Sequence, residues 1–208
     1  MLKNNPSNWD ALYQCIQTDE LTWHEPLPLN SVKLITLLNL PKDASIIDVG
    51  AGGSMLVNYL LALGFRNITV ADFSVEGLMR AKMQLGNLAS QVKWIHANIL
   101  ELTGISQYDL WHDRATLQFF NDSKEQITYV KTAYKALKPN GHVILGQFAK
   151  EAPELCHEFI VQKFSENKFD KLFRSLFKKT DTIYHKHITP ANGLLPFIYC
   201  SFRKSDFL

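Results

Sequence analysis

Hydrophobic and polar positions alternate along the chain in blocks that suit short buried strands and amphipathic helices. Between about residue 30 and residue 148 the two kinds of block follow one another regularly. The apolar runs predict strands at 45–49, 67–71, 92–97, 108–111 and 142–148. The blocks between and before them predict helices at 31–40, 54–63, 74–85 and 123–137. This alternation predicts an α/β fold in which helices cover both faces of a doubly wound, mostly parallel sheet.

The pattern changes after residue 148. Apolar side chains first take a helical spacing, at Phe169, Leu172, Phe173, Leu176 and Phe177. Two extended stretches, 182–188 and 195–203, then flank the sequence Pro-Ala-Asn-Gly at 190–193, which is typical of a turn. A helix followed by an antiparallel β-hairpin is therefore expected to complete a seven-stranded sheet.

Three glycines follow the first predicted strand. Residues 46–54 read Ile-Ile-Asp-Val-Gly-Ala-Gly-Gly-Ser, so a buried strand ends at Asp48 and runs directly into the glycines. Glycines let the backbone turn tightly and approach a ligand closely, although a turn without a ligand is the structural alternative. The second strand ends at Asp72, about 20 residues after Gly52, where an acidic side chain in such units accepts hydrogen bonds from ribose hydroxyls. The sequence therefore predicts a ligand that contains adenosine.

Two of these segments resemble a known family. Asp-Val-Gly-Ala-Gly-Gly-Ser (48–54) and Ala-Asp-Phe-Ser (71–74) are similar to the glycine and ribose-binding motifs of class I S-adenosylmethionine-dependent methyltransferases. Pyridine-dinucleotide enzymes instead place a third glycine at the sixth position, where a pyrophosphate meets the helix N-terminus. Counted from Gly50 that position is Met55, which favours a ligand without a pyrophosphate. The resemblance covers nearly the whole chain and implies a Rossmann-like fold, S-adenosylmethionine as cofactor and S-adenosylhomocysteine as product.

The resemblance also implies a set of cofactor contacts at the carboxyl ends of the strands. They are Asp48, Gly50, Ala51, Gly52, Asp72, Phe73, Asn98, Ile99, His112 and Arg114, together with Trp23 from the N-terminal segment. Asn98 stands where the family commonly has an aspartate that accepts a hydrogen bond from the adenine amino group. Its amide oxygen accepts with less charge assistance. Phe73 and Ile99 would lie against the adenine faces, unless they are ordinary core residues.

Three ionisable residues, His112, Asp113 and Arg114, follow the fourth predicted strand. A buried sheet tolerates such side chains only when they are paired or line a cleft. The sequence Asp-Leu-Trp-His-Asp-Arg-Ala (109–115) resembles a motif in a branch of bacterial class I methyltransferases, where this strand ends beside the sulfonium. It implies His112 or Asp113 as the catalytic proton acceptor and Arg114 as the partner of a carboxylate. An ion pair of Asp113 with Arg114 is the structural alternative.

The N-terminal segment resembles the same branch. Residues 8–13 read Asn-Trp-Asp-Ala-Leu-Tyr and residues 21–26 read Leu-Thr-Trp-His-Glu-Pro. In that branch a helix and loop fold over the cofactor, which makes Trp23 and His24 lid candidates. Packing of the N-terminal helix on the sheet is the alternative. We expect one class I methyltransferase domain, 1–208, with an N-terminal helical lid at 1–40 and a Rossmann-like core at 41–208.

Histidines 185 and 187 alternate along one predicted strand, so both side chains fall on the same face. Such a pair could hold a metal ion. The sequence offers no third ligand near them, so a solvated hairpin without a metal is the expectation.

Composition limits the class of protein further. The chain has 208 residues, of which 46% are hydrophobic, enough for one substantial core. A net charge of +2 gives no global basic field, so nucleic acid is not an expected partner. Cys15, Cys156 and Cys200 lack the spacing of a disulfide framework or a zinc site. Since no apolar run reaches the roughly 18 residues that span a bilayer, we expect a soluble cytoplasmic protein, a monomer or weak dimer.

The sequence predicts transfer of a methyl group to an acceptor that it does not identify. A small-molecule acceptor is favoured because the chain is short and carries no inserted substrate domain. Protein lysine is the alternative, because the Trp-Asp-x-x-Tyr start also resembles seven-strand lysine methyltransferases. Two hypotheses from other classes are a non-catalytic module that binds S-adenosylmethionine or S-adenosylhomocysteine, and a nucleotide-binding oxidoreductase.

Overall fold

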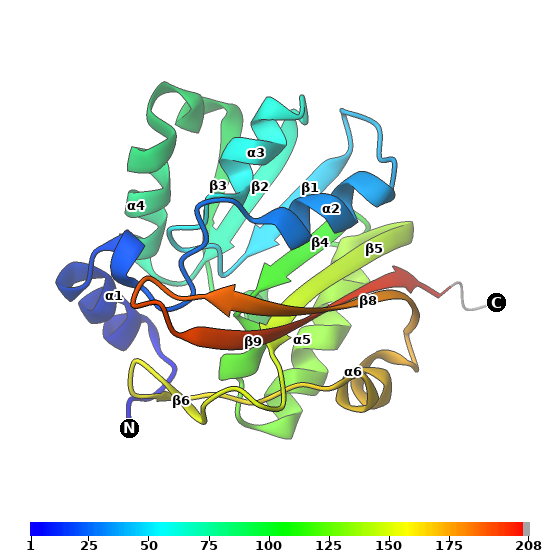
Figure 1. Cartoon of the computed structure of the whole chain (residues 1–208). Helices are drawn as coiled ribbons and strands as arrows, with labels where there is room; N and C mark the ends of the chain where they lie inside the picture. The colour runs from blue at the N-terminus through cyan, green and yellow to red at the C-terminus, as the bar shows by residue number, and fades with distance from the viewer. Residues whose placement is uncertain (206–208) are drawn as a thin grey trace.

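A seven-stranded sheet runs through the centre of the protein, with helices on both faces (Figure 1). The structure is a computed structural model that describes residues 1–205. In spatial order the strands are β3 (Val92–His96), β2 (Asn67–Asp72), β1 (Ser45–Val49), β4 (Tyr108–Arg114), β5 (Leu137–Phe148), β9 (Leu194–Lys204) and β8 (Phe177–Ile188). The first five are parallel, and β9 is antiparallel to both of its neighbours. The predicted fold class, a mostly parallel sheet closed by an antiparallel hairpin, is confirmed.

The helices contribute to two cores, one on each face of the sheet. The first core takes side chains from α1 (Pro6–Cys15), α2 (Leu29–Leu37), α3 (Leu56–Ala62) and α4 (Val75–Leu85). The second takes them from α5 (Ser123–Ala136) and α6 (Glu166–Phe173). Neighbouring β1 residues Ile46 and Ile47 enter opposite cores because strand side chains alternate between faces. Within residues 1–205, no helix is both long and apolar enough to cross a bilayer.

Short elements complete the chain. They are the 3-10 helices η1 (Thr18–Glu20), η2 (Gly86–Gln91), η3 (Ile99–Glu101) and η4 (Leu117–Phe119), and the two-residue strands β6 (Leu155–Cys156) and β7 (Phe159–Ile160). The hairpin of β6 and β7 was absent from the sequence prediction, because two-residue strands leave no periodic pattern. It meets the chain's beginning, where the Leu2 amide donates to the Glu158 carbonyl over 3.0 Å.

The prediction that the fourth strand ends at residue 111 was wrong, because β4 continues to Arg114. His112 and Asp113 pair with β1 and β5 and are at most 1% exposed. Buried partners for these polar side chains let the strand continue through them. Similarly, the helical stripe predicted to reach Phe177 stops earlier: α6 ends at Phe173, and Phe177 begins β8.

The N-terminal segment packs against α4 at the carboxyl edge of the sheet (Figure 1). The Ser74 hydroxyl donates to Asp10 Oδ1 over 2.6 Å, and Arg80 Nη1 donates to the Ile16 carbonyl over 2.6 Å. The Trp9 ring stacks on Phe159 with centroids 4.5 Å apart. These contacts hold α1 beside the ends of β1 and β2, where a lid would have to lie.

Candidate functional site

A pocket opens at the carboxyl ends of β1 to β4, between the sheet and the N-terminal segment. Its wall includes these predicted cofactor contacts: Asp48, Gly50, Ala51, Asp72, Phe73, Asn98, Ile99, Arg114 and Trp23. The lid candidate His24 is also in the wall. His112 and Asp113 lie behind the wall. Residues far apart in sequence thus converge on one cavity, and their contacts with a cofactor stay a prediction.

The glycine loop between β1 and α3 is shaped for close approach. Gly50 and Gly52 have φ angles of 59° and 46°, in the left-handed region that favours glycine. A Cβ atom at Gly50 would collide with the Thr116 side chain, and one at Gly52 would collide with the Tyr13 ring. The loop therefore depends on glycine at both positions for its conformation and for its packing.

Asp72 closes β2 and holds the glycine loop. Its Oδ2 accepts the Gly52 amide over 2.9 Å, and its Oδ1 accepts the Ser74 amide over 2.8 Å. Burial raises the pKa of Asp72 to about 6, against the lowering effect of the backbone amides. The carboxylate is thus positioned by backbone donors at the pocket wall, with lone pairs left for further donors.

Asp48 and His112 form a buried pair behind the pocket. His112 Nδ1 lies 2.7 Å from Asp48 Oδ1, and its Nε2 lies 2.8 Å from the Ser31 hydroxyl of α2. An Nδ1–H that donates to Asp48 and an Nε2 that accepts from Ser31 satisfy both ring nitrogens. Asp48 Oδ2 is buried and has no hydrogen-bond partner among the described residues. That oxygen is a ready acceptor for a cationic group in the pocket.

Asp113 is buried on the other face of the sheet. It accepts hydrogen bonds from the Tyr129 hydroxyl at 2.5 Å, from Gln147 Nε2 at 2.8 Å and from the Thr116 and Leu117 amides. Burial raises the pKa of the Asp113 carboxyl above its usual value. These four donors fix the turn after β4. The predicted alternative of an ion pair between Asp113 and Arg114 does not form, because alternation places the two side chains on opposite faces.

Arg114 joins the sheet to the N-terminal segment. Its Nη1 donates to the Trp23 carbonyl over 2.6 Å, and its Nε lies 2.9 Å from Glu25 Oε2 and 3.0 Å from the Tyr199 hydroxyl. The guanidinium carbon also lies 4.6 Å from the centre of the Phe197 ring. This one side chain holds the loop that carries Trp23 and Glu25 against the hairpin.

Aromatic rings form much of the remaining wall. Trp9 makes an edge contact with Phe119 at 4.8 Å between centroids and lies 5.7 Å from Trp23. All three rings line the pocket. Such a wall favours a ligand with a flat apolar surface.

The side chain of Asn98, predicted to contact the cofactor, caps a short helix in this structure. Its Oδ1 accepts the Leu100 amide over 3.1 Å and so caps η3, while its Nδ2 donates to Glu101 over 3.2 Å. The amide oxygen keeps a second lone pair, and Asn98 belongs to the pocket wall. Contact with adenine stays a prediction.

The wall also contains residues that were missing from the sequence prediction, among them Tyr13, Glu25 and Thr116. Tyr13 and Glu25 lie inside the two N-terminal motifs, so proximity to a lid candidate was the available signal. Thr116, whose hydroxyl donates to the Val49 carbonyl over 3.1 Å, gave no local signal. Its role depends on the pairing of β4 with β1.

The wall fits S-adenosylmethionine on the evidence of its own donors and acceptors. The left-handed glycine loop lies at the pocket wall, and Asp72 offers acceptors for ribose hydroxyls. The unpartnered Asp48 Oδ2 suits the ammonium of a methionine moiety, and the unpartnered Arg114 Nη2 suits its carboxylate. The pocket thus provides complementary groups for each polar part of the cofactor.

Comparisons with known proteins point the same way. Residues 47–143 match the family described as methyltransferase domain. Human EEF1A lysine methyltransferase 2 is 26% identical over 171 residues, which cover 73% of this chain and 71% of that protein. A malonyl-[acyl-carrier protein] O-methyltransferase from Priestia megaterium is 31% identical over 143 residues, 65% of this chain and half of that protein.

A solved structure supports the fold. The 1,6-didemethyltoxoflavin-N1-methyltransferase of Burkholderia thailandensis was crystallised with 1,6-didemethyltoxoflavin and S-adenosylhomocysteine. Its structure matches this chain with a TM-score of 0.75 at 22% identity, over 97% of this chain and 87% of that one. The relatives thus combine one fold with acceptors of different chemical classes.

Proposed function

This protein is an S-adenosylmethionine-dependent methyltransferase of the class I fold, and we propose that it methylates a small molecule with a flat apolar portion. The predictions of methyltransferase activity and of S-adenosylmethionine as cofactor are confirmed. The acceptor class is the new element of the proposal. It rests on the aromatic wall of the pocket described above.

The aromatic wall and the polar groups beside it carry the proposal. Trp9, Trp23 and Phe119 line the pocket together, and the segment that holds Trp23 is fixed by Arg114. Aromatic walls with a few polar groups are typical of sites for small ligands. The Burkholderia thailandensis relative, which was crystallised with a small acceptor-type ligand, offers a parallel.

The cofactor would supply a methyl group already activated by a sulfonium, so the protein needs chiefly to align an acceptor and exclude water. Asp72 and the glycine loop orient the adenosine, while Asp48 and Arg114 orient the amino acid part. When bound, the cofactor would give up its methyl group to the acceptor, with S-adenosylhomocysteine as the other product. An acceptor that carries a proton loses it to a base or to solvent.

The predicted bases, His112 and Asp113, are better understood as positioning residues. His112 uses both ring nitrogens on Asp48 and Ser31, and Asp113 accepts four hydrogen bonds inside the core. His24 lines the pocket, and burial lowers the pKa of its imidazole, which leaves it neutral and able to accept a proton at pH 7. We assign the proton-accepting role to His24 for acceptors that need one.

Protein lysine remains the second candidate because the human relative is a lysine methyltransferase that matches over 71% of its own length. A lysine side chain would have to thread between Trp9, Trp23 and Phe119. Aromatic rings also stabilise ammonium groups, so the same wall accommodates this alternative.

A labelling experiment separates the two candidates. Purified protein and S-adenosylmethionine with a labelled methyl group are added to an extract of the organism that encodes the chain, and the extract is then divided by size. Label in the metabolite fraction, lost with Asp72→Ala, supports a small acceptor. Label confined to protein and resistant to excess metabolite fraction would replace it with the lysine alternative.

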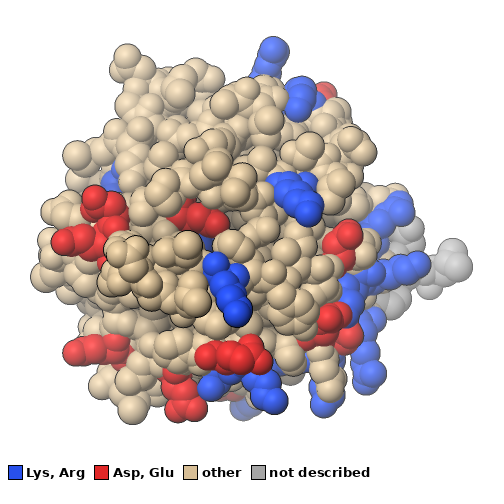
Figure 2. All heavy atoms as spheres, in the orientation of Figure 1, with Lys and Arg blue, Asp and Glu red and all other residues tan. Residues whose placement is uncertain are grey.

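Location and partners follow the same reasoning. We propose a cytoplasmic protein, as a monomer or weak dimer, without nucleic acid or membrane as partner. The three cysteines are free, and Cys156 and Cys200 are buried. On the face shown in Figure 2, acidic side chains interrupt the basic ones, so that face presents no continuous basic patch. This supports a freely diffusing acceptor over nucleic acid.

A further inference from the structure

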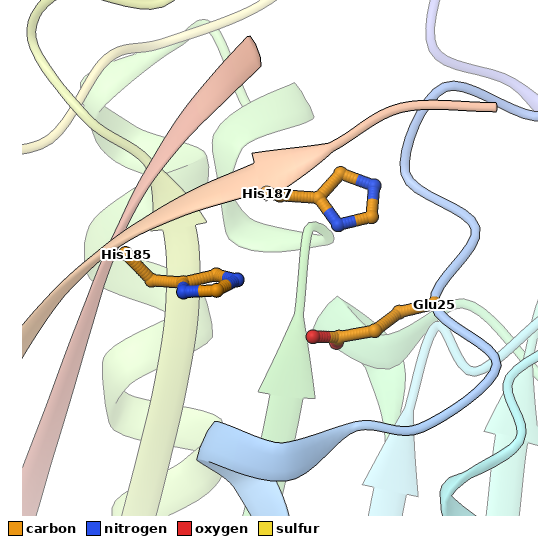
Figure 3. A group of neighbouring side chains, drawn as sticks. All are labelled: Glu25, His185 and His187. Atoms are coloured by element: carbon orange, nitrogen blue, oxygen red, sulfur yellow. The ribbon is translucent and has the colours of Figure 1, made fainter. Parts of the chain in front are cut away.

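We propose that Glu25, His185 and His187 bind a divalent transition-metal ion that joins the N-terminal segment to the edge strand β8. One ligand atom from each of the three side chains lies within 4.8 Å of the other two. Figure 3 shows the carboxylate of Glu25 pointing from the N-terminal loop toward the two imidazoles. The third candidate ligand, absent from the sequence prediction, thus comes from a segment some 160 residues away.

The fold holds the three groups together. His185 and His187 lie two residues apart on β8, so both side chains extend from the same face of the edge strand. Arg114 brings Glu25 to them, because its Nε contacts Glu25 Oε2 and its Nη1 holds the neighbouring Trp23 carbonyl. The cluster therefore depends on tertiary structure that also forms the pocket.

Secondary contacts orient two of the three ligands, His187 and Glu25, as they do in known metal sites. His187 Nε2 donates to the Thr22 carbonyl over 3.1 Å, which leaves Nδ1 as the acceptor nitrogen. Metal-binding imidazoles usually donate their second nitrogen in this manner. Arg114 Nε lies 2.9 Å from Glu25 Oε2. The guanidinium thus orients the carboxylate, as hydrogen-bonded partners do for carboxylates that bind metal ions.

The donor set indicates the class of ion. Two imidazoles and a carboxylate suit Zn²⁺, Co²⁺ and similar ions, and three protein ligands leave a fourth position for water or another ligand. A tetrahedral ion with bonds of about 2.1 Å needs donor atoms roughly 3.4 Å apart. Rotation of the partly exposed His185 side chain would bring the donor atoms closer to this spacing.

The charge of the cluster agrees with a cation at this position, because the carboxylate of Glu25 lies beside the two imidazoles. Arg114 carries a positive charge near the cluster, and the imidazole of His24 also lies nearby. The Arg114 guanidinium is held by the Tyr199 hydroxyl and the Phe197 ring and forms an ion pair with Glu25.

Binding is tested without methyl transfer, so the result is independent of the acceptor. Untagged protein, stripped with chelator, is titrated with Co²⁺ while the visible d–d absorption is recorded, and with Zn²⁺ by calorimetry. One equivalent should bind, and saturation at about 100 times Kd should raise Tm by roughly 5 to 10 °C. His185→Gln and Glu25→Gln should each weaken binding by at least about tenfold.

The controls distinguish this site from others. His96→Gln changes an exposed imidazole on β3 outside the cluster and should bind Co²⁺ as the unmodified chain does. His187 is 4% exposed, so its substitution could disturb folding, and the two partly exposed ligands are the informative positions. Absence of binding, retained affinity in both variants, or a thiolate charge-transfer band from the exposed Cys15 would overturn the proposal.

Discussion

The two halves of the pocket are built by different kinds of interaction. On the adenosine side, the backbone does most of the positioning: the glycine loop has left-handed φ angles, and Asp72 accepts amides from both flanking turns. On the side formed by the N-terminal loop, long side chains connect segments that are distant in sequence. Arg114 of β4 contacts Glu25 and Trp23 of the N-terminal loop and Tyr199 of β9.

This difference corresponds to two functions of the pocket: recognition of the cofactor, which relatives share, and recognition of the acceptor, which differs among them. A site made of backbone turns and one carboxylate recognises the same adenosine in every member of a fold family. A site made of side chains from loops can change its shape by substitution while the sheet stays intact. The relatives, which share the domain but are named for different acceptors, follow this division.

The largest expected effect comes from breaking the connection between β4 and the N-terminal loop at Arg114. Arg114→Met leaves Glu25 without its counter-charge at a site where both side chains are at most 12% exposed. Loss of one partner of a buried ion pair costs about 3 to 5 kcal/mol. Urea unfolding should show a decrease of this size in the free energy of unfolding.

A matched control uses an exposed arginine. Arg203 donates to Asn140 Oδ1 over 2.6 Å at the surface. Arg203→Met should change the free energy of unfolding by less than about 1 kcal/mol. Equal decreases in the free energy of unfolding of the two variants would contradict a special contribution of the buried ion pair between Arg114 and Glu25.

The next effect concerns the adenosine side. Asp72→Ala removes the carboxylate predicted to accept two ribose hydroxyls, and two hydrogen bonds to a charged group are together worth about 3 kcal/mol. The affinity for S-adenosylhomocysteine should fall by about 100-fold in calorimetry. Asp109→Ala, at the opposite end of β4, should retain the affinity when folded. A similar loss in both variants would remove the ribose assignment.

The same division explains what could be predicted from sequence. The glycine loop, Asp72 and the alternation of strands and helices are local patterns, and the fold they predicted is confirmed. The positions of Glu25 and Thr116 depend on which distant segments meet, and no local pattern encodes that. His112 and Asp113 looked like strand-end chemistry because their buried partners, Ser31 and Tyr129, lie on other elements.

A smaller effect should follow from pH. Burial raises the pKa of Asp72 to about 6, so its ionisation in the folded protein costs stability. The free energy of unfolding of the unliganded protein should therefore decrease as the pH rises from about 4 to about 6. A ligand that needs the carboxylate should bind more weakly as pH falls below about 6, by up to about tenfold per pH unit. 5′-Methylthioadenosine, which lacks an amino acid amine, is the suitable calorimetric probe.

Asp72→Asn is the control for this profile. The amide has nearly the shape of the carboxyl group but does not titrate, so the affinity of the variant should be lower and independent of pH between 5 and 7 within roughly twofold. If the affinity of Asp72→Asn depended on pH as that of the unmodified protein does, another group in the wall would be the one that titrates.

The smallest expected effect is a gain at Asn98. Asn98→Asp restores the charge that the family commonly has at this position, and charged acceptors form hydrogen bonds roughly twice as strong as neutral ones. The side chain already accepts a hydrogen bond from the Leu100 amide, so part of the added charge would strengthen that contact instead of one to adenine. The affinity for S-adenosylhomocysteine should therefore rise only about two- to fivefold. Inosine-based S-inosylhomocysteine, which lacks the adenine amino group, should show no gain. An equal gain for both ligands would mean that the new carboxylate acts through the η3 cap rather than on adenine.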